Sequence, residues 1–438
     1  TRPTPGQTVK ATALRSGALS RPEPFMRPSL AALAFSIALS APALAGPSAD
    51  LAASALEGRG PAFEQAAQAM RAAPAGDQEA RFGEGLLLFA RAVERYGQAQ
   101  YRHGLRVPPA GAGFLPFLRM PVPVNPSPEP LGYEAQRKTL AAFLDDLGKA
   151  KAALAKVEGD PKIRFDMNAV ALDFTGDPSR RVRLGDLVAQ MQSGGRAMRP
   201  GAPPPAGPQD WRVAFDRGDA LWLQGYCNLL SAGLEFALAH DWSESFGILG
   251  RQFYPRAEAP AIPFVTARDG RGMTGADGDI VDLVAFVHSI RWPVVEPKRM
   301  SAARERLLET IALSRASWKA ILAETDDERE WIPSPDQKDA AVTFAPVTQQ
   351  TVDGWLATLG DFEAALKGEK LVGHWRLSKG FDLSKVFTQP RPFDLVLWAS
   401  GHAAAPYVAD GPTLDATSWR QWNMMLNGGF LGYAVWFN

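Results

Sequence analysis

Acidic, basic and aromatic side chains gather where a long apolar stretch of the sequence ends. His240, Asp241, Trp242 and Glu244 lie close together, and Glu235 precedes them by about one and a half helical turns. Paired carboxylates can act as acid and base in glycosidic cleavage, and an indole can stack on a sugar ring. The pattern therefore indicates the two glutamates, His240 and Asp241 as candidate catalytic residues and Trp242 as a candidate ligand-binding residue. A helix C-terminus followed by a new N-cap would explain the same residues without catalysis.

Two polar residues interrupt the apolar stretch itself. Asn228 and Glu235 are surrounded in the sequence by leucine, alanine and phenylalanine. A carboxylate in apolar surroundings must be paired, protonated or solvated in a cavity, because burial penalises its charged form. We therefore interpret Asn228 as a second ligand-binding candidate. The sequence leaves open whether Glu235 faces a cavity or meets a structural arginine.

Two acidic patterns resemble cation-binding loops. Asp173 and Asp177 begin a stretch with glycine at the turn, as a calcium loop requires, but Leu184 occupies the twelfth position, where a bidentate glutamate is expected. Asp277 and Asp279 belong to a second cluster at a predicted helix start, where acidic residues also suit the helix dipole. These four aspartates are the candidate metal ligands. A plain turn and a helix N-terminus are the alternative interpretations.

Other catalytic and cofactor motifs are absent from the sequence. No two of the five histidines have the i, i+4 spacing of a helical metal pair, and there is no HExxH, GxSxG or P-loop motif. The single cysteine, Cys227, excludes an internal disulfide and a zinc site built from cysteines. The sequence thus indicates no cofactor and leaves open whether the protein is an enzyme.

Helical periodicity dominates the segments that must position these residues, so we predict a mainly α-helical fold. Residues 211–242 are apolar on most sides, as expected of a central helix in a large domain. The helices could form either a bundle-like or an α/α toroid-like domain. The predicted helices are 81–105, 133–157, 211–242, 279–290, 301–323 and 351–366.

Proline-rich segments divide the helical regions. Residues 107–132 combine prolines with large apolar residues, which predicts an extended strap with Phe114, Phe117 and Met120 buried. Residues 193–209 are rich in glycine and proline and predict an exposed loop.

This loop separates an N-terminal helical region, 46–192, from a C-terminal one, 210–438, and we expect the two to pack as one globular unit. Residues 393–400 and 430–438 are rich in aromatic and β-branched residues and predict a small C-terminal β element.

Residues 26–45 have the pattern of a secretory signal peptide. Arg27 precedes a short apolar segment, 30–39, and Ala43-Leu44-Ala45 forms an A-x-A cleavage site. Gly46 follows in place of the cysteine of a lipid-modified leader. We therefore expect a periplasmic or secreted protein without a transmembrane anchor, and treat residues 1–25 as an upstream segment outside the fold.

The charge balance narrows the range of partners. Residues 1–45 contain five of the 47 basic and one of the 47 acidic residues, so 42 basic and 46 acidic side chains remain. Nucleic acid binding needs a concentrated basic surface, and the sequence contains no basic run that would supply one.

These observations favour an exported helical protein with a binding or scaffold role, because helical organisation is clear while catalytic motifs are absent. Its partner would be a small molecule, a glycan or another protein, and its mark would be an apolar or aromatic patch. One alternative is a carbohydrate-active enzyme of all-α build, which requires a cleft with two carboxylates within roughly 5 to 10 Å. The other is a weak cation-binding module.

Overall fold

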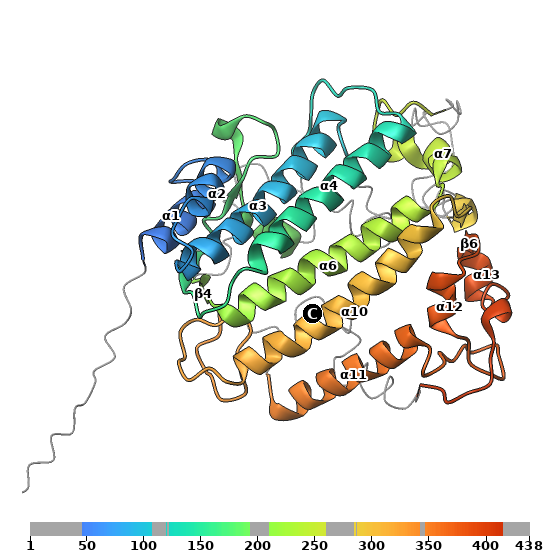
Figure 1. Cartoon of the computed structure of the whole chain (residues 1–438). Helices are drawn as coiled ribbons and strands as arrows, with labels where there is room; N and C mark the ends of the chain where they lie inside the picture. Colours follow the sequence, from blue (N-terminus) through green and yellow to red (C-terminus); the bar gives the residue numbers. More distant parts are fainter. Residues whose placement is uncertain are drawn as a thin grey trace, which may run out of the picture. The chain divides into compact units, whose positions relative to one another are not determined.

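Four long helices lie side by side and form a central layer (Figure 1). In sequence order they are α3 (Gln78–Arg102), α4 (Tyr133–Leu154), α6 (Arg217–Ala239) and α10 (Pro297–Ile321). Each packs against the next along this order. The computed structural model describes residues 46–106, 120, 122–192, 210–259, 284–285, 287–341 and 347–414.

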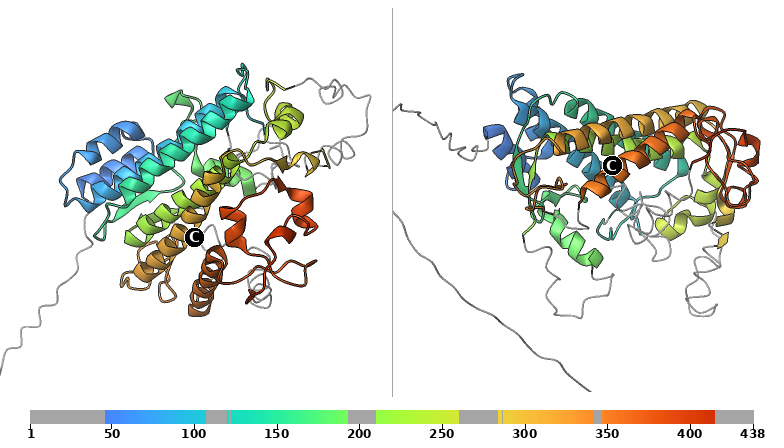
Figure 2. Two further views of the ribbon diagram at one scale, coloured as in Figure 1. Left: turned by 45° about the vertical axis from the view of Figure 1, so that its right-hand side comes forward. Right: turned by 90° about the horizontal axis from the view of Figure 1, so that it is seen from below.

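Shorter helices extend and cover this layer. Helices α1 and α2 pack against α3, whereas α11 packs against α10, and α12 contacts both α10 and α11. The turned views show α5 and α7 on one side of the layer (Figure 2). These helices are α1 (Pro47–Leu56), α2 (Phe63–Arg71), α5 (Leu184–Gln192), α7 (Ser243–Phe253), α11 (Gln349–Lys367), α12 (Leu383–Thr388) and α13 (Leu395–Ala399).

The strands form three small antiparallel pairs within the described part of the chain. The pair β1–β4 lies next to the start of α6, and β5–β6 joins the segment after α7 to the C-terminal region. The pairs are β1 (Ile163–Asp166) with β4 (Arg212–Phe215), β2 (Ala171–Leu172) with β3 (Val182–Arg183), and β5 (Arg291–Trp292) with β6 (Phe393–Asp394). The prediction of a mainly α-helical fold with a small C-terminal β element is therefore confirmed.

Two boundaries differ from the sequence prediction for local reasons. Helix α6 begins at Arg217 rather than at residue 211, because Asp216 caps it and forms a capping box with Asp219. The predicted strand 393–400 is only two residues long and then becomes α13. The carboxylate of Asp394 accepts a hydrogen bond from the Leu397 backbone N–H and starts this helix.

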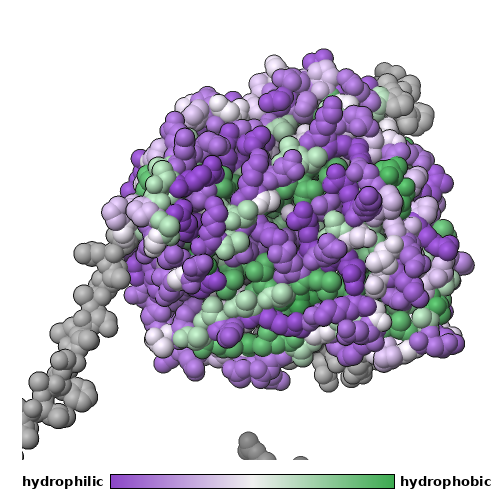
Figure 3. Space-filling view, viewed as in Figure 1, coloured by the Kyte–Doolittle hydropathy of each residue, from purple (hydrophilic) through white to green (hydrophobic). Residues whose placement is uncertain are grey.

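The largest hydrophobic core joins helices α1 to α4 and α6, and a second core lies between α10 and α11. Trp318 and Trp355 fill the second core, and Trp355 donates a hydrogen bond from Nε1 to Ser314 Oγ at 3.1 Å. The face drawn in Figure 3 is mostly hydrophilic, with an apolar band over the region of α10 and α11. Among the described helices, none has a stretch long and apolar enough to cross a membrane.

Part of the predicted strap and loop lies beyond what the structure describes. Met120 is half-buried against the core beside α7, but Phe114 and Phe117 are outside the described residues. The same is true of residues 193–209 and of the predicted strand 430–438.

Close packing between α3 and the turn after β2 gives a first prediction. Gly97 lies against the ring of Phe174, and a Cβ atom at this position would overlap that ring. We expect Gly97→Ala to lower the free energy of unfolding by about 2 kcal/mol, because an overpacked core must shift. Gly148 on α4 is the control, since nothing would meet its Cβ within 4 Å. Gly148→Ala should stabilise the protein by about 0.5 to 1 kcal/mol in the same denaturant titration.

Candidate functional site

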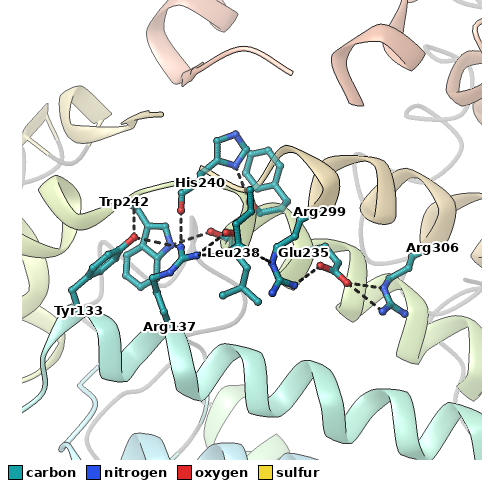
Figure 4. A network of polar contacts seen from close by, with 11 residues as sticks. Tyr133, Arg137, Glu235, Leu238, His240, Trp242, Arg299 and Arg306 are labelled. Carbon is teal, nitrogen blue, oxygen red and sulfur yellow. Dashed lines mark hydrogen bonds and ion pairs between the residues drawn. The ribbon is translucent and has the colours of Figure 1, made fainter. Parts of the chain in front are cut away.

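Glu235 lies on α6 as a fully paired anion (Figure 4). Its side chain is 7% exposed. Arg299 Nη1 donates to Oε2 at 2.8 Å, and Arg306 Nη2 donates to Oε1 at 3.2 Å. Both arginines come from α10, and their charges balance the cost of burying the carboxylate. Of the two alternatives left by the sequence, the structure places Glu235 against arginines.

Arg137 of α4 binds the C-terminus of α6 (Figure 4). Its guanidinium donates to the backbone carbonyls of Leu238 and His240, each at 2.8 Å, and also binds the carboxylate of Glu296 at 2.9 Å. The last carbonyls of a helix have no partner within the helix, so these bonds satisfy groups that would otherwise be unpaired. The network joins α4, α6 and α10 at one end of the layer.

His240 is almost completely buried, and burial lowers its pKa. Its Nδ1 lies 2.8 Å from the carbonyl oxygen of Phe236, which identifies Nδ1 as the protonated nitrogen. Phe236, Trp292 and Phe393 surround the ring. The imidazole packs among these rings between α6 and the C-terminal segment, where it lines a cavity of ≈ 380 Å³.

Asp241 and Glu244 make the contacts of a helix boundary. Partial burial opposes ionisation of Asp241, but hydrogen bonds from Ser243 and Tyr133 outweigh it and lower the pKa. Glu244 is exposed and pairs with Arg291 at 2.9 Å. The sequence neighbours of His240 are therefore held by separate partners.

The remaining candidates do not converge on one site. Asn228 is fully buried and accepts a hydrogen bond from Lys151 Nζ at 3.1 Å. Asp173 closes a turn by accepting from the backbone N–H groups of Thr175 and Gly176, and Asp177 caps a short 3-10 helix, η3 (Pro178–Arg180). Asp277 and Asp279 lie outside the described residues.

Trp242 lines an apolar cavity of ≈ 160 Å³ beside the Arg137 network. Its indole packs edge-on against Tyr133, and its Nε1 donates to the carbonyl of Ala237 at 3.1 Å. Most of the lining is buried, whereas Ala237, Trp242 and Trp292 are half-buried. Among the described residues, no charged side chain lines the cavity. The described lining consists of Tyr96, Gln136, Leu140, Leu234, Ala237, Trp242, Ser245, Phe246, Leu249, Gly250, Phe253, Tyr254 and Trp292.

A short chain of hydrogen bonds forms the polar part of this wall. Tyr254 donates its hydroxyl proton to Gln100 Oε1 at 2.5 Å and accepts from Gln136 Nε2 at 3.2 Å. Burial raises the pKa of Tyr254 well above its usual value, so the phenol keeps its proton. Among the described residues, neither Gln136 Oε1 nor Gln100 Nε2 has a hydrogen-bond partner.

A group of carboxylates near the start of α6 was not predicted from the sequence. Asp216, Glu324 and Glu330 each place an oxygen within 4.8 Å of the others. Within the described chain these three are the only group of carboxylate, histidine or cysteine ligands close enough to share a metal ion. Asp219 lies beside them and bonds to the backbone N–H of Asp216. The only sequence signal was the acidic run 324–330, because the chain brings Asp216 to it from more than 100 residues away.

Burial and mutual repulsion keep protons on this cluster. The pKa of Glu324 is raised to about 9. Burial is the largest cause, and repulsion by the neighbouring carboxylates is the next. Burial is also the main cause that raises the pKa of Glu330 to about 7 and those of Asp216 and Asp219. Lys162, whose charge favours ionisation of Asp216 and Glu330, is itself paired with Asp326. The cluster is therefore partly protonated near neutral pH.

Comparison of the chain with protein-family models, curated proteins and solved structures finds no match. The function must be argued from the geometry of these sites.

Proposed function

We propose that the protein binds a small uncharged apolar molecule in the cavity between α4, α6 and α7. The observation that carries the proposal is the lining, which is apolar and aromatic apart from a few buried polar groups. A dry cavity of about 150 Å³ lined by apolar residues can bind benzene. A cavity of ≈ 160 Å³ therefore suits one aromatic ring or a short hydrocarbon segment.

The contacts that the lining leaves unfilled support a binding role. Apolar side chains beside an empty pocket lack dispersion contacts on that side, and an apolar ligand would supply them. The tryptophans at positions 242 and 292 supply large aromatic surfaces for those contacts.

The chemistry of the lining favours binding over glycan cleavage. No carboxylate lines the described part of the cavity, where the hydroxyl groups of a sugar would lose most of their hydrogen bonds to water without replacement. Glu235, the central acid of the enzymatic alternative, already has both oxygens occupied by arginines. On the strength of the predicted leader at residues 26–45, we further propose that this binding occurs in the periplasm or outside the cell.

Toluene is the first probe for this cavity. At a toluene concentration about 100 times Kd, we expect the folded state to gain about 2.7 kcal/mol, seen as a rise in Tm by calorimetry. The variant Ala237→Phe should lose this rise, because the new ring would occupy the space of the ligand.

Ala135 supplies the matched control, since it is exposed on α4 and does not line the cavity. Ala135→Phe should respond to toluene as the wild-type protein does. An equal response of Ala237→Phe, or no response of the wild-type protein to toluene, would contradict the proposal.

A further inference from the structure

A second and larger cavity lies between the central layer and the C-terminal segment. Its walls come from α6, α10 and α12, and from β6, α13 and the 3-10 helix η4 (Ala405–Tyr407). Helix α12 packs against α10 at the end of the layer where this segment lies (Figure 1). The volume of this C-terminal cavity is ≈ 380 Å³, more than twice the ≈ 160 Å³ of the cavity between α4, α6 and α7. A ligand of the C-terminal cavity can therefore be larger than a single ring.

Aromatic side chains form much of the wall of the C-terminal cavity. They are Phe236, Phe387, Phe393, Trp398 and Tyr407. Phe393 packs edge-on against Phe236 with the ring centroids 5.2 Å apart, and Trp398 stacks on Tyr407 at 6.2 Å. These contacts hold the rings in place, and aromatic rings offer large apolar surfaces to a ligand. We therefore expect the body of the ligand to be apolar.

Charged side chains distinguish this cavity from the smaller one. Arg291 and Arg391 both belong to its lining and are exposed, so the cavity meets solvent beside them. Arg291 pairs with Glu244 at 2.9 Å, whereas Arg391 has no ion pair within the described chain. Burial raises the pKa of Tyr407 and the charge of Arg391 opposes that rise, so the guanidinium lies near this phenol of the wall. Arg391 is therefore an unpaired cation at the mouth of the cavity.

The other polar groups of the lining leave positive charge in excess. Asp394 is the one acidic residue in the described lining, and its carboxylate accepts a hydrogen bond from the Leu397 backbone N–H at the start of α13. His240 adds no charge at neutral pH, because burial lowers its pKa. The described lining thus carries two arginines and one carboxylate, a balance that is complementary to an anionic ligand.

We propose that the C-terminal cavity binds a carboxylic acid with an apolar body, and that the carboxylate of the ligand pairs with Arg391. A planar guanidinium can donate two parallel hydrogen bonds to a carboxylate. The apolar body would then lie among the aromatic side chains, away from the charged mouth. This site is separate from the smaller cavity and takes a charged ligand, so it does not depend on the proposed function.

Titration calorimetry with three probes of the same carbon skeleton tests the charge of the ligand. Phenylpropionate, phenylpropanol and phenylpropylamine differ only at the end of the chain, which is an anion, a neutral hydroxyl group or a cation. We expect phenylpropionate to bind about tenfold more tightly than phenylpropanol, since a hydrogen bond between charged groups is worth about a factor of ten. Phenylpropylamine should bind most weakly, because the arginines repel its charge.

The variant Arg391→Gln assigns this preference to one residue. The affinity for phenylpropionate should fall about tenfold, while the affinity for phenylpropanol should stay the same. Arg376→Gln is the matched control, because Arg376 is also exposed, belongs to the same C-terminal segment and does not line the cavity. Its guanidinium lies over the ring of Trp375 instead. The control loses the same charge and should bind phenylpropionate as the wild-type protein does.

The variant Ala237→Phe shows which of the two cavities the acid occupies. Its new ring would fill the smaller cavity, so this variant should bind phenylpropionate as tightly as the wild-type protein does. Loss of phenylpropionate binding by the folded variant would place the acid in the smaller cavity and overturn the proposal.

The wild-type series decides the ligand class even where a variant does not fold. Absence of phenylpropionate binding, equal affinities for phenylpropionate and phenylpropanol, or tightest binding of phenylpropylamine would each show that the cavity does not select an anion. An equal loss of phenylpropionate affinity in Arg391→Gln and Arg376→Gln would show that Arg391 makes no specific contact with the acid. The toluene response of the smaller cavity tests the proposed function separately.

Discussion

As the pH rises from 7 to 9, the wild-type protein is expected to lose about 2 kcal/mol more stability than the variant Glu324→Gln. In the folded protein the pKa of Glu324 is raised to about 9 by burial and by the neighbouring Asp216 and Glu330. Its usual value is 4.5. The folded state therefore holds a proton that the unfolded state releases throughout this pH range.

The direction of the effect follows from this difference in proton binding. The stability that Glu324 contributes is fully present below pH 4.5 and is lost as the pH rises through about 9. One excess proton in the folded state corresponds to a loss of about 1.4 kcal/mol per pH unit, which we reduce because Glu324 is partly exposed to solvent. Glutamine cannot ionise, so the variant does not lose this stability.

The measurement is a denaturant titration at pH 7, 8 and 9 in the presence of EDTA, so that protons are the only cations the cluster can bind. His240 titrates below this window, because burial lowers its pKa. Groups remote from the cluster cancel in the difference between the two proteins, whereas Asp216 and Glu330 interact with Glu324 and contribute to that difference. Glu305→Gln, an exposed change on α10, should run parallel to the wild-type protein. Parallel curves for Glu324→Gln would contradict the assignment of protons to the cluster.

The variant Glu235→Leu is expected to lower the free energy of unfolding by about 3 kcal/mol. The change leaves Arg299 and Arg306 without the carboxylate that both of them bind. Both arginines are about one-quarter to one-third exposed, so water relieves part of the penalty and places the effect at the lower end for a buried ion pair.

Two further variants show whether the loss comes from the ion pairs. Glu244→Gln removes an exposed carboxylate that pairs with Arg291, and it should cost less than about 0.5 kcal/mol. In a double-mutant cycle, Arg299→Met should cost less in the Glu235→Leu background than in the wild-type protein. Equal costs in both backgrounds would show that Glu235 does not act through Arg299.

The sequence predicted the long helices closely, but it predicted one C-terminal segment wrongly. The helices predicted at 133–157, 301–323 and 351–366 correspond to α4, α10 and α11 with ends within a few residues. The segment 393–400 was predicted as a strand because it is aromatic and β-branched, yet it is mostly helical. Asp394 caps this helix by accepting a hydrogen bond from the Leu397 backbone N–H.

The sequence also predicted only part of the candidate site. Trp242 was singled out as a ligand-binding residue and lines the cavity, whereas Gln136 and Tyr254 carried no signal in the sequence. Their significance arises only in the fold, where Tyr254 bonds to Gln100 across 154 residues of chain and to Gln136 across 118 residues. The partners of Glu235 were equally invisible, since both arginines lie more than 60 residues further along the chain.

The sequence by itself determined the helical class of the protein and the positions of its long helices, because hydrophobic periodicity acts between residues three and four positions apart. Only the tertiary structure decided which polar side chains are paired, protonated or open to a ligand. These states depend on burial and on charges brought from distant segments, as Asp216 and Glu324 are brought together at the start of α6. Such distances are set by packing of the whole helical layer, and no local pattern in the sequence encodes them.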